Sequence, residues 1–483
     1  MVRVLLAGLA GLAVTLPRWL PGRVVALRMK IFALVNGEEG LPIPGERVGV
    51  EDFRRVYADP AAGGRSKGAA LSDLFWYWLA PGPQVHQEHL EAGPRYDEVA
   101  KTTRQILVKT KAESEELTRR CAARVLDGLE AGDGRTIRLR DEMMPIWAEL
   151  YYELVFGEPC PAEARDLIVG HADDVVSALK CVRPRNMRRR ARLTAYLRRR
   201  LADVPHTMPS RLTPEEQVFY LQGTFFNTAV VQMSEAMAHL LMIIAQHPDV
   251  QARLAADPDD DEYLDRVIDE GLRTYPLFGI AHRIATDDIE LDHTKIDAGT
   301  VLLFSYPDFH HAGFERPDEF DPERWNPQPL NPQPLNTQPL KTQPEASVPV
   351  ASAGFPVRTA VAPVPAKKDA NFLPFGVAQN RACPARGLAP LTMRVVTREV
   401  LRRFSLASSA AHTRSIPNRG PVILTPRGSR APSSAALASL AARDRWEDVW
   451  RSLAQLVFGT YMVLDARHKR LCAKYFESYG GEG

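Results

Sequence analysis

One short segment of the chain combines residue types suited to presenting a reactive thiolate. Residues 373–387 read LPFGVAQNRACPARG, so Cys383 stands between alanine and proline, after a Pro-Phe-Gly turn. Residues 388–404 have helical periodicity, which puts Cys383 just before a helix N-terminus. Backbone N–H groups and the helix dipole stabilise a negative sulfur there. Arg381, two residues earlier, is placed to pair with an anionic group.

The remaining cysteines do not form a second site. The chain has five cysteines, and they are scattered without a CxxC pair, which argues against a disulfide framework and a zinc site. The other four are expected to be small buried apolar residues. They are Cys121, Cys160, Cys181 and Cys472.

Three charged residues could fix the support of the cysteine segment. Glu270 and Arg273 are three positions apart on a predicted helix, so their side chains share one face and can pair. Arg324, in the sequence DPERW, is a second arginine that could approach Glu270. A buried Arg–Glu–Arg cluster is costly to desolvate and persists mainly where geometry must be fixed.

A long apolar helix is predicted between Thr213 and His247. Thr213, followed by proline and then by Glu216, is typical of a helix start, and Pro248 ends the apolar stretch. About 35 residues at 1.5 Å each would span roughly 50 Å, enough to cross a whole domain. A helix that is apolar on most sides should be buried in the middle of the fold.

In order and content, these elements resemble the cytochrome P-450 family: a long central helix, an ExxR helix, a PERF-like PERW and a Phe-Gly…Arg-x-Cys loop. The resemblance implies a mainly α fold with a small β region. It implies that Cys383 ligates the iron of haem b (iron protoporphyrin IX) and that Glu270, Arg273 and Arg324 form a structural triad. It also implies cofactor-binding positions in the loop and in the strand region, at Phe375, Gly376, Arg381 and Arg283. A further haem contact from an earlier helix stays open among His86, His89 and Arg104.

Two departures from the family pattern bear on mechanism. The cysteine loop has one residue more than the common form, and Ala378 or Gln379 stands where glycine is expected. Ala385 also replaces a usual glycine.

In the long helix, the place of the family's acid–alcohol pair is held by Val231 and Gln232. Asn227 and Thr228 lie one turn earlier and could serve if the helix is bulged. The catalytic candidates are therefore Gln232, Thr228 and Asn227.

The implied function is a haem-thiolate oxidoreductase that inserts oxygen into an apolar or amphipathic organic substrate. Electrons would come from a separate ferredoxin or flavoprotein, since the chain has no Gly-rich nucleotide-binding loop. The missing acid–alcohol pair motivates an alternative enzyme that uses or rearranges a peroxide. The loop changes motivate a second alternative, a non-catalytic haem-binding or interaction protein. Apolar candidates for the substrate pocket, which are equally good core residues, are Phe225, Phe226, Val230 and Met233.

Composition and local patterns divide the chain into three parts. We expect an N-terminal apolar segment and lead-in over residues 1–47, a catalytic domain over 48–428 and a helical tail over 429–483. A proline-rich, low-complexity insertion over residues 326–368 includes a repeated pentapeptide, NPQPL, and cannot bury a core. In the tail, a helix over 441–475 carries a stripe that should form a docking surface, as a packed appendage or as a dimer contact. The stripe is Trp446, Trp450, Leu453, Leu456, Val457 and Tyr461.

The charge balance and the N-terminal segment bear on partners and location. A net charge of +2 gives no argument for nucleic acid binding. The apolar run over residues 4–16 is short for a bilayer-spanning helix, which needs roughly 20 apolar residues. A membrane anchor, a transit sequence and a packed first helix all remain open. We accordingly expect a protein that is either cytoplasmic or attached to a membrane and facing the cytoplasm.

Overall fold

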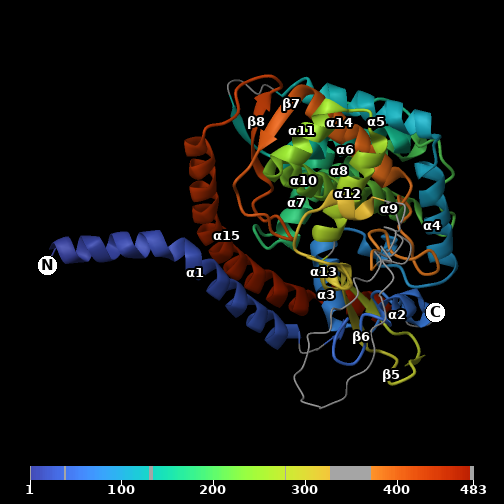
Figure 1. Cartoon of the computed structure of the whole chain (residues 1–483). Helices are drawn as coiled ribbons and strands as arrows, with labels where there is room; N and C mark the ends of the chain where they lie inside the picture. The colour runs from blue at the N-terminus through green and yellow to red at the C-terminus, as the bar shows by residue number, and fades with distance from the viewer. Residues whose placement is uncertain (1, 37–39, 130–133, 278, 327–370, 479–483) are drawn as a thin grey trace, which may run out of the picture.

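A computed structural model describes residues 2–36, 40–129, 134–277, 279–326 and 371–478. Helices dominate these ranges, and three small sheets lie beside them (Figure 1). The predicted mainly α architecture with a small β region is therefore confirmed. Apart from its first residue, Asn326, the predicted insertion over 326–368 lies outside the described residues.

The helices fall into two groups along the chain. Those before the central helix are α1 Val2–Asn36, α2 Phe53–Ala58, α3 Ala70–Leu79, α4 Pro94–Leu107, α5 Lys111–Leu126, α6 Leu139–Phe156, α7 Ala162–Leu179 and α8 Met187–Arg200. Those from the central helix onward are α9 Pro214–Gly223, α10 Val230–Gln246, α11 Pro248–Ala256, α12 Asp261–Thr274, α13 Tyr306–His311, α14 Leu388–Arg403, α15 Ser434–Lys469 and α16 Leu471–Ser478.

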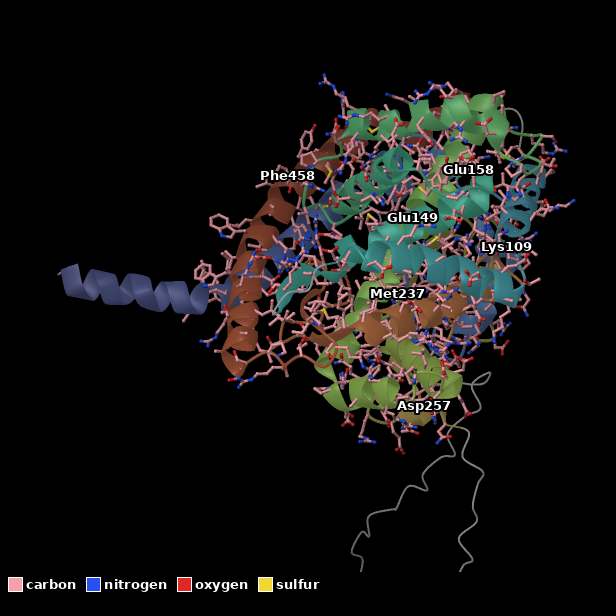
Figure 2. The ribbon with its side chains drawn as sticks, turned by 90° about the horizontal axis from the view of Figure 1, so that it is seen from above. Lys109, Glu149, Glu158, Met237, Asp257 and Phe458 are labelled. Atoms are coloured by element: carbon pink, nitrogen blue, oxygen red, sulfur yellow. The ribbon has the colours of Figure 1, made fainter. Side chains whose placement is uncertain are left out.

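The central helix is continuous from Pro214 to Gln246 and contains a wider turn. Its ordinary helical parts, α9 and α10, are joined by a π-helical segment, Thr224–Ala229. Thr213 and Glu216 form the expected capping box, and Pro248 begins the next helix. Among the described residues this is the one helix long and apolar enough to cross a membrane, but 83% of its apolar window is buried. It is a core helix, and Figure 2 shows Met237 of α10 in the middle of the bundle.

Residues 95–129 form two separate helices. α4 ends at Leu107, and α5 begins after Thr110. The Thr110 side chain accepts a hydrogen bond from the Glu113 N–H, and Glu113 accepts one from the Thr110 N–H. This capping box satisfies the N–H groups of a new helix start, which is why the chain breaks there.

The strands make three separate small sheets. In the first, β1 Leu41–Ile43 runs parallel to β6 Val301–Ser305, and β3 Ile280–Ile284 runs antiparallel to β6. The second pairs β2 Arg135–Arg138 and β7 Phe404–Ala407 with β8 Pro421–Pro426, all antiparallel. The third is a hairpin of β4 Ile289–Glu290 and β5 Lys295–Ile296. Residues 285–288 connect the end of β3 to this hairpin.

The C-terminal helices pack against the body through a face other than the predicted stripe. Met462, Val463 and Ala466 of α15 are buried against α3, where they meet Leu74 and Trp78. The tryptophan-containing stripe faces outward instead: Trp450 is 69% exposed and Val457 63%. α15 runs beside the second half of α1, whose first half extends away from the body (Figure 1).

Candidate active site

The cysteine loop holds Cys383 through the backbone. The Cys383 N–H donates to the Phe375 carbonyl over 3.1 Å, which closes the loop on itself. Gly376 has φ +70°, and a Cβ there would come within 3.3 Å of the Tyr57 hydroxyl, so this position favours glycine. The extra residue relative to the family pattern falls at the exposed tip, Ala378 and Gln379, which is closed by a bridge between the flanking residues.

The electrostatic surroundings of Cys383 are mixed. Burial raises the pKa of the Cys383 thiol to about 11, while an N–H from Ala385 and the charge of Arg386 act in the opposite direction. The side chain is nevertheless half-buried rather than sealed in the core. A thiol in this setting is neutral without a metal, and coordination to a cation would deprotonate it.

Glu270 lies at the centre of a fully buried ion-pair cluster. Arg273 binds both of its carboxylate oxygens, at 2.8 and 2.9 Å, and Arg324 Nε donates to Oε1 over 3.0 Å. Trp325 Nε1 donates to Oε2 over 2.9 Å. The guanidiniums also bind the carbonyls of residues 315–319, so the cluster fastens α12 to the segment that contains PERW. The structure thus brings together the three residues of the predicted triad.

Three arginines from distant segments converge beside the cysteine loop. Arg381 lies 4.4 Å from the ring of Tyr96, and burial together with the nearby charge of Arg65 lowers its pKa to about 9. Arg283 of β3 is buried, donates to the carbonyl of Tyr57 over 2.9 Å, and has its pKa lowered by burial and by Arg65. The Nε atoms of Arg65 and Arg283 are buried without a hydrogen-bond partner in the described part of the chain.

The three candidates for the earlier haem contact differ in how deeply they are buried. Arg104 is exposed on α4, whereas His86 and His89 are buried on the loop between α3 and α4. Burial lowers the pKa of His86 to about 4, so its ring is neutral. His86 packs directly against the central helix, because a Cβ at Gly223 would lie 1.8 Å from its Nε2. Neither ring nitrogen of His86 has a partner among the described residues.

One face of the central helix is partly exposed. Thr228, Val231 and Gln232 are half-buried, although the helix around them is buried. Asn227 points elsewhere: it is 2% exposed, and its Oδ1 has no hydrogen-bond partner in the described ranges. The apolar pocket candidates are also turned into the core, where each is at most 6% exposed: Phe225, Phe226, Val230 and Met233.

A carboxylate that the motifs do not reveal contacts this face. Glu88, on the loop between α3 and α4, accepts a hydrogen bond from Gln232 Nε2 over 3.0 Å and a second one from the Thr228 hydroxyl. Burial raises its pKa, and its charge in turn raises the pKa of Cys383. Glu88 is therefore within electrostatic range of the thiol. Only its position between His86 and His89 in the sequence could have drawn attention to it.

The residues present fit a haem group. A half-buried thiol suits iron, and the converging guanidiniums of Arg65, Arg283 and Arg381 suit two carboxylates that would neutralise them. The buried Nε atoms of Arg65 and Arg283 have no hydrogen-bond partner among the described residues, and such carboxylates would provide one. In the described ranges, no group of three or more His, Cys, Asp or Glu residues could hold a metal ion by itself.

Comparisons with known proteins identify the family of the chain. The family model described as Cytochrome P-450 matches residues 162–430. Cytochrome P-450 3A6 of Oryctolagus cuniculus is 31% identical over 104 residues, which are 18% of this chain and 21% of that protein. Cyclooctat-9-en-7-ol 5-monooxygenase of Streptomyces melanosporofaciens is 31% identical over 114 residues, 20% of this chain and 25% of that protein. The chain thus matches only about a fifth to a quarter of the length of these curated relatives.

A solved structure extends the likeness of fold over most of the chain. A variant of cytochrome P-450SP alpha superposes with a TM-score of 0.59, covering 79% of this chain and 90% of its own, at 15% identity. At that identity the likeness concerns the fold alone. The comparison of structures therefore establishes the fold, while the chemistry has to be argued from the residues.

Proposed function

Because the chain belongs to the cytochrome P-450 family, we propose that it is a haem-thiolate oxidoreductase that inserts oxygen into an apolar or amphipathic organic substrate. The observation that carries the proposal is that Arg65, Arg283 and Arg381 converge at the loop that contains Cys383. The family membership favours an enzyme over a non-catalytic haem-binding protein.

In this proposal the chain's own residues hold and orient the cofactor. Cys383 would ligate the iron of haem b, Arg65, Arg283 and Arg381 would pair with its propionates, and the loop at Phe375 would cover one face. When bound, the haem would supply the oxidising chemistry, which thiolate ligation favours. The buried triad at Glu270 keeps the support of the loop in one geometry.

Thr228 and Gln232 are the proposed polar groups on the substrate side. Both lie on the accessible face of the central helix, and both donate a hydrogen bond to Glu88. The π-helical segment that contains Thr228 matches the bulge that would let the Asn227–Thr228 turn serve. Asn227 itself is buried away from these contacts and is the weakest of the three candidates.

The test is the absorption spectrum of the dithionite-reduced protein with carbon monoxide. We expect a strongly red-shifted thiolate band in the wild type and its loss in Cys383→Ala. Cys160→Ala is the matched control, since Cys160 is also half-buried but lies at the start of α7. Circular dichroism would show that Cys383→Ala still folds. A band that survives in Cys383→Ala would refute the proposed ligand.

The electron donor is a separate proposal. A ferredoxin or a flavoprotein would dock on the side of the cysteine loop, near α14. The basic residues of α14 are poor anchors, because Arg394 pairs with Asp265 and Arg403 with Glu399 and Asp127. Oxygen uptake with each donor class would decide between them. No oxygen uptake with either donor, together with turnover by peroxide alone, would favour the alternative, an enzyme that uses peroxide. The motivation for that alternative is that Val231 and Gln232 replace the family's acid–alcohol pair.

Membrane attachment is the remaining proposal about partners. Trp19 of α1 is 47% exposed, and Tyr461 and Leu464 of α15 are each 54% exposed on the neighbouring helix. Tryptophan and tyrosine on an exposed apolar face suit the interface of a lipid bilayer. We expect the full chain to float with phosphatidylcholine vesicles and to do so less after Trp450→Ser. A chain that stays with the soluble fraction would refute this attachment and leave the transit sequence and the packed first helix as the alternatives.

A further inference from the structure

The central helix lacks an acidic residue at the expected position, but Glu88 from another segment brings a carboxylate to the site. Glu88 lies on the loop between α3 and α4, 144 positions before Gln232, yet its Oε1 is 3.0 Å from Gln232 Nε2. Thr228, one turn earlier on the same face, donates its hydroxyl to the same carboxylate. Resting on the proposed function, we propose that Glu88 supplies the carboxyl of a proton relay with Thr228 and Gln232, assembled between two segments rather than within the central helix.

The loop that carries Glu88 is held from both sides. Arg381 of the cysteine loop donates to the carbonyls of Gln87, over 3.5 Å, and Leu90, over 2.7 Å. On the other side the Ser66 hydroxyl donates to the carbonyl of His89 over 2.9 Å. The carboxylate is therefore fixed between the cysteine loop and the central helix, which is where a relay to the haem site must lie.

Glu88 differs from the structural carboxylates around it. Glu91, three positions later, accepts backbone N–H groups from Arg65, Ser66 and Lys67 and holds that turn together. Glu88 makes no ion pair in the part of the chain that the structure describes; its partners are an amide and a hydroxyl. Both partners carry an acceptor oxygen as well as a donor, whereas an arginine side chain can only donate.

The surroundings of Glu88 shift it toward its protonated form. Burial raises its pKa, and the opposing influences are Arg65 and the hydrogen bonds from Gln232 and Thr228. The other titratable groups nearby are Cys383, on which the charge of Glu88 acts, and the adjacent His86 and His89, whose pKa values burial lowers. The histidines are therefore neutral and do not hold Glu88 in its charged form.

The transfer balances within the chain and water. The protonated carboxyl of Glu88 gives its proton to the Thr228 oxygen, and the Thr228 hydroxyl releases its own proton toward the substrate side. Glu88 is left as a carboxylate and regains a proton from solvent water. Gln232 keeps the carboxylate in place during the exchange. Glu88 acts through Thr228, so it is a positioning and proton-supplying residue rather than one that touches the reacting atoms.

The experiment compares Glu88→Gln, which keeps the shape but cannot give up a proton, with Glu88→Asp, which keeps the acid. In the reduced holoenzyme with dioxygen, we expect Glu88→Gln to lower product formed per electron pair at least about 10-fold, the scale of a lost general acid. Glu88→Asp should recover part of the loss. With hydrogen peroxide in place of dioxygen and reductant, Glu88→Gln should stay near wild type, because peroxide brings its own protons.

A second readout does not depend on turnover. Infrared spectra of the full-length protein, titrated across neutral pH, should contain a protonated-carboxyl band that disappears in Glu88→Gln. The matched control is Glu142→Gln, because Glu142 on α6 also has its pKa raised by burial and lies away from the site. A band that survives in Glu88→Gln, or equal coupling in Glu88→Gln and wild type, would overturn the relay.

The two proposals can fail separately. A wild-type protein without the thiolate band of the carbon monoxide complex would refute the proposed function and the relay together. A normal thiolate band, with unchanged coupling in Glu88→Gln, would refute the relay alone. Equal losses in Glu88→Gln with dioxygen and with peroxide would show that Glu88 only holds the loop.

Discussion

Arg324 Nε donates to Glu270 Oε1 over 3.0 Å, although 54 positions separate the two residues in sequence. Arg273 donates a hydrogen bond to each oxygen of the same carboxylate. The side chains of Arg273 and Glu270 are fully buried. A buried carboxylate is tolerated only while nearby positive charges balance its own. Glu270 therefore depends on both guanidiniums, and each of them depends on Glu270. The cluster therefore fixes α12 against the PERW turn, and with it one wall of the site.

Breaking the cluster should unfold the protein more easily than breaking a surface pair. Glu270→Gln leaves two buried guanidiniums without their shared carboxylate, which should lower the free energy of unfolding by ~3–5 kcal/mol. The comparison is Glu319→Gln, which removes a carboxylate from an exposed pair with Arg316 and should cost less than ~1 kcal/mol. Urea unfolding followed by circular dichroism measures both. Similar costs for the two variants would contradict a structural role for Glu270.

Acid should destabilise the protein through its buried histidines. His310 is fully buried, and burial lowers its pKa from the ordinary 6.5 to about 3. Between these values the unfolded chain binds a proton that the folded one does not, so stability is complete above pH 6.5 and falls as the pH falls. His310 alone should account for ~2 kcal/mol between pH 7 and pH 5.

The pH test uses an exposed histidine as its reference. His310→Asn should reduce the difference in unfolding free energy between pH 7 and pH 5, whereas His293→Asn, on a half-exposed surface side chain, should leave it unchanged. Urea unfolding at the two pH values gives the difference directly. An unaltered difference in His310→Asn would mean that its ring is charged, or solvated, in the folded state.

A methyl group at Gly223 should displace His86. The added Cβ would lie 1.8 Å from His86 Nε2 and 2.0 Å from its Cδ2, so the ring must move away from the central helix. Overpacking of this kind costs ~1–3 kcal/mol. The loop with Glu88 should shift with the ring, so haem content should fall as well. Gly22→Ala on α1, where nothing lies within 4 Å of the new atom, should lower neither the melting temperature nor haem content, because alanine favours a helix more than glycine does.

The sequence predicts some parts of this site better than others for physical reasons. Glu270 and Arg273 are fixed by the spacing of one helix, and Cys383 by a short loop whose turn residues are local. Arg65 and Glu88 are not predictable in this way, because each reaches the site through a loop placed by packing against distant segments. The stripe at Trp450 faces outward, so of its two predicted roles the dimer contact stays a prediction: helical spacing shows that an apolar face exists but not whether it meets the body.

The arginine cluster provides the last prediction. Arg65, Arg283 and Arg381 lie near one another in the interior, and their mutual repulsion, with burial, lowers the pKa of Arg381 to about 9. Haem propionates would relieve that repulsion, so Arg381→Gln should release haem to an apo-globin acceptor roughly 10-fold faster. In the protein without haem, Arg381→Gln loses the hydrogen bond to the Leu90 carbonyl but also removes one of three like charges, so the melting temperature should change little. Arg104→Gln, on the exposed face of α4, should alter neither quantity. A haem-free Arg381→Gln protein that melts far below the wild type would show that the guanidinium serves the loop, through the carbonyl of Leu90, rather than the cofactor.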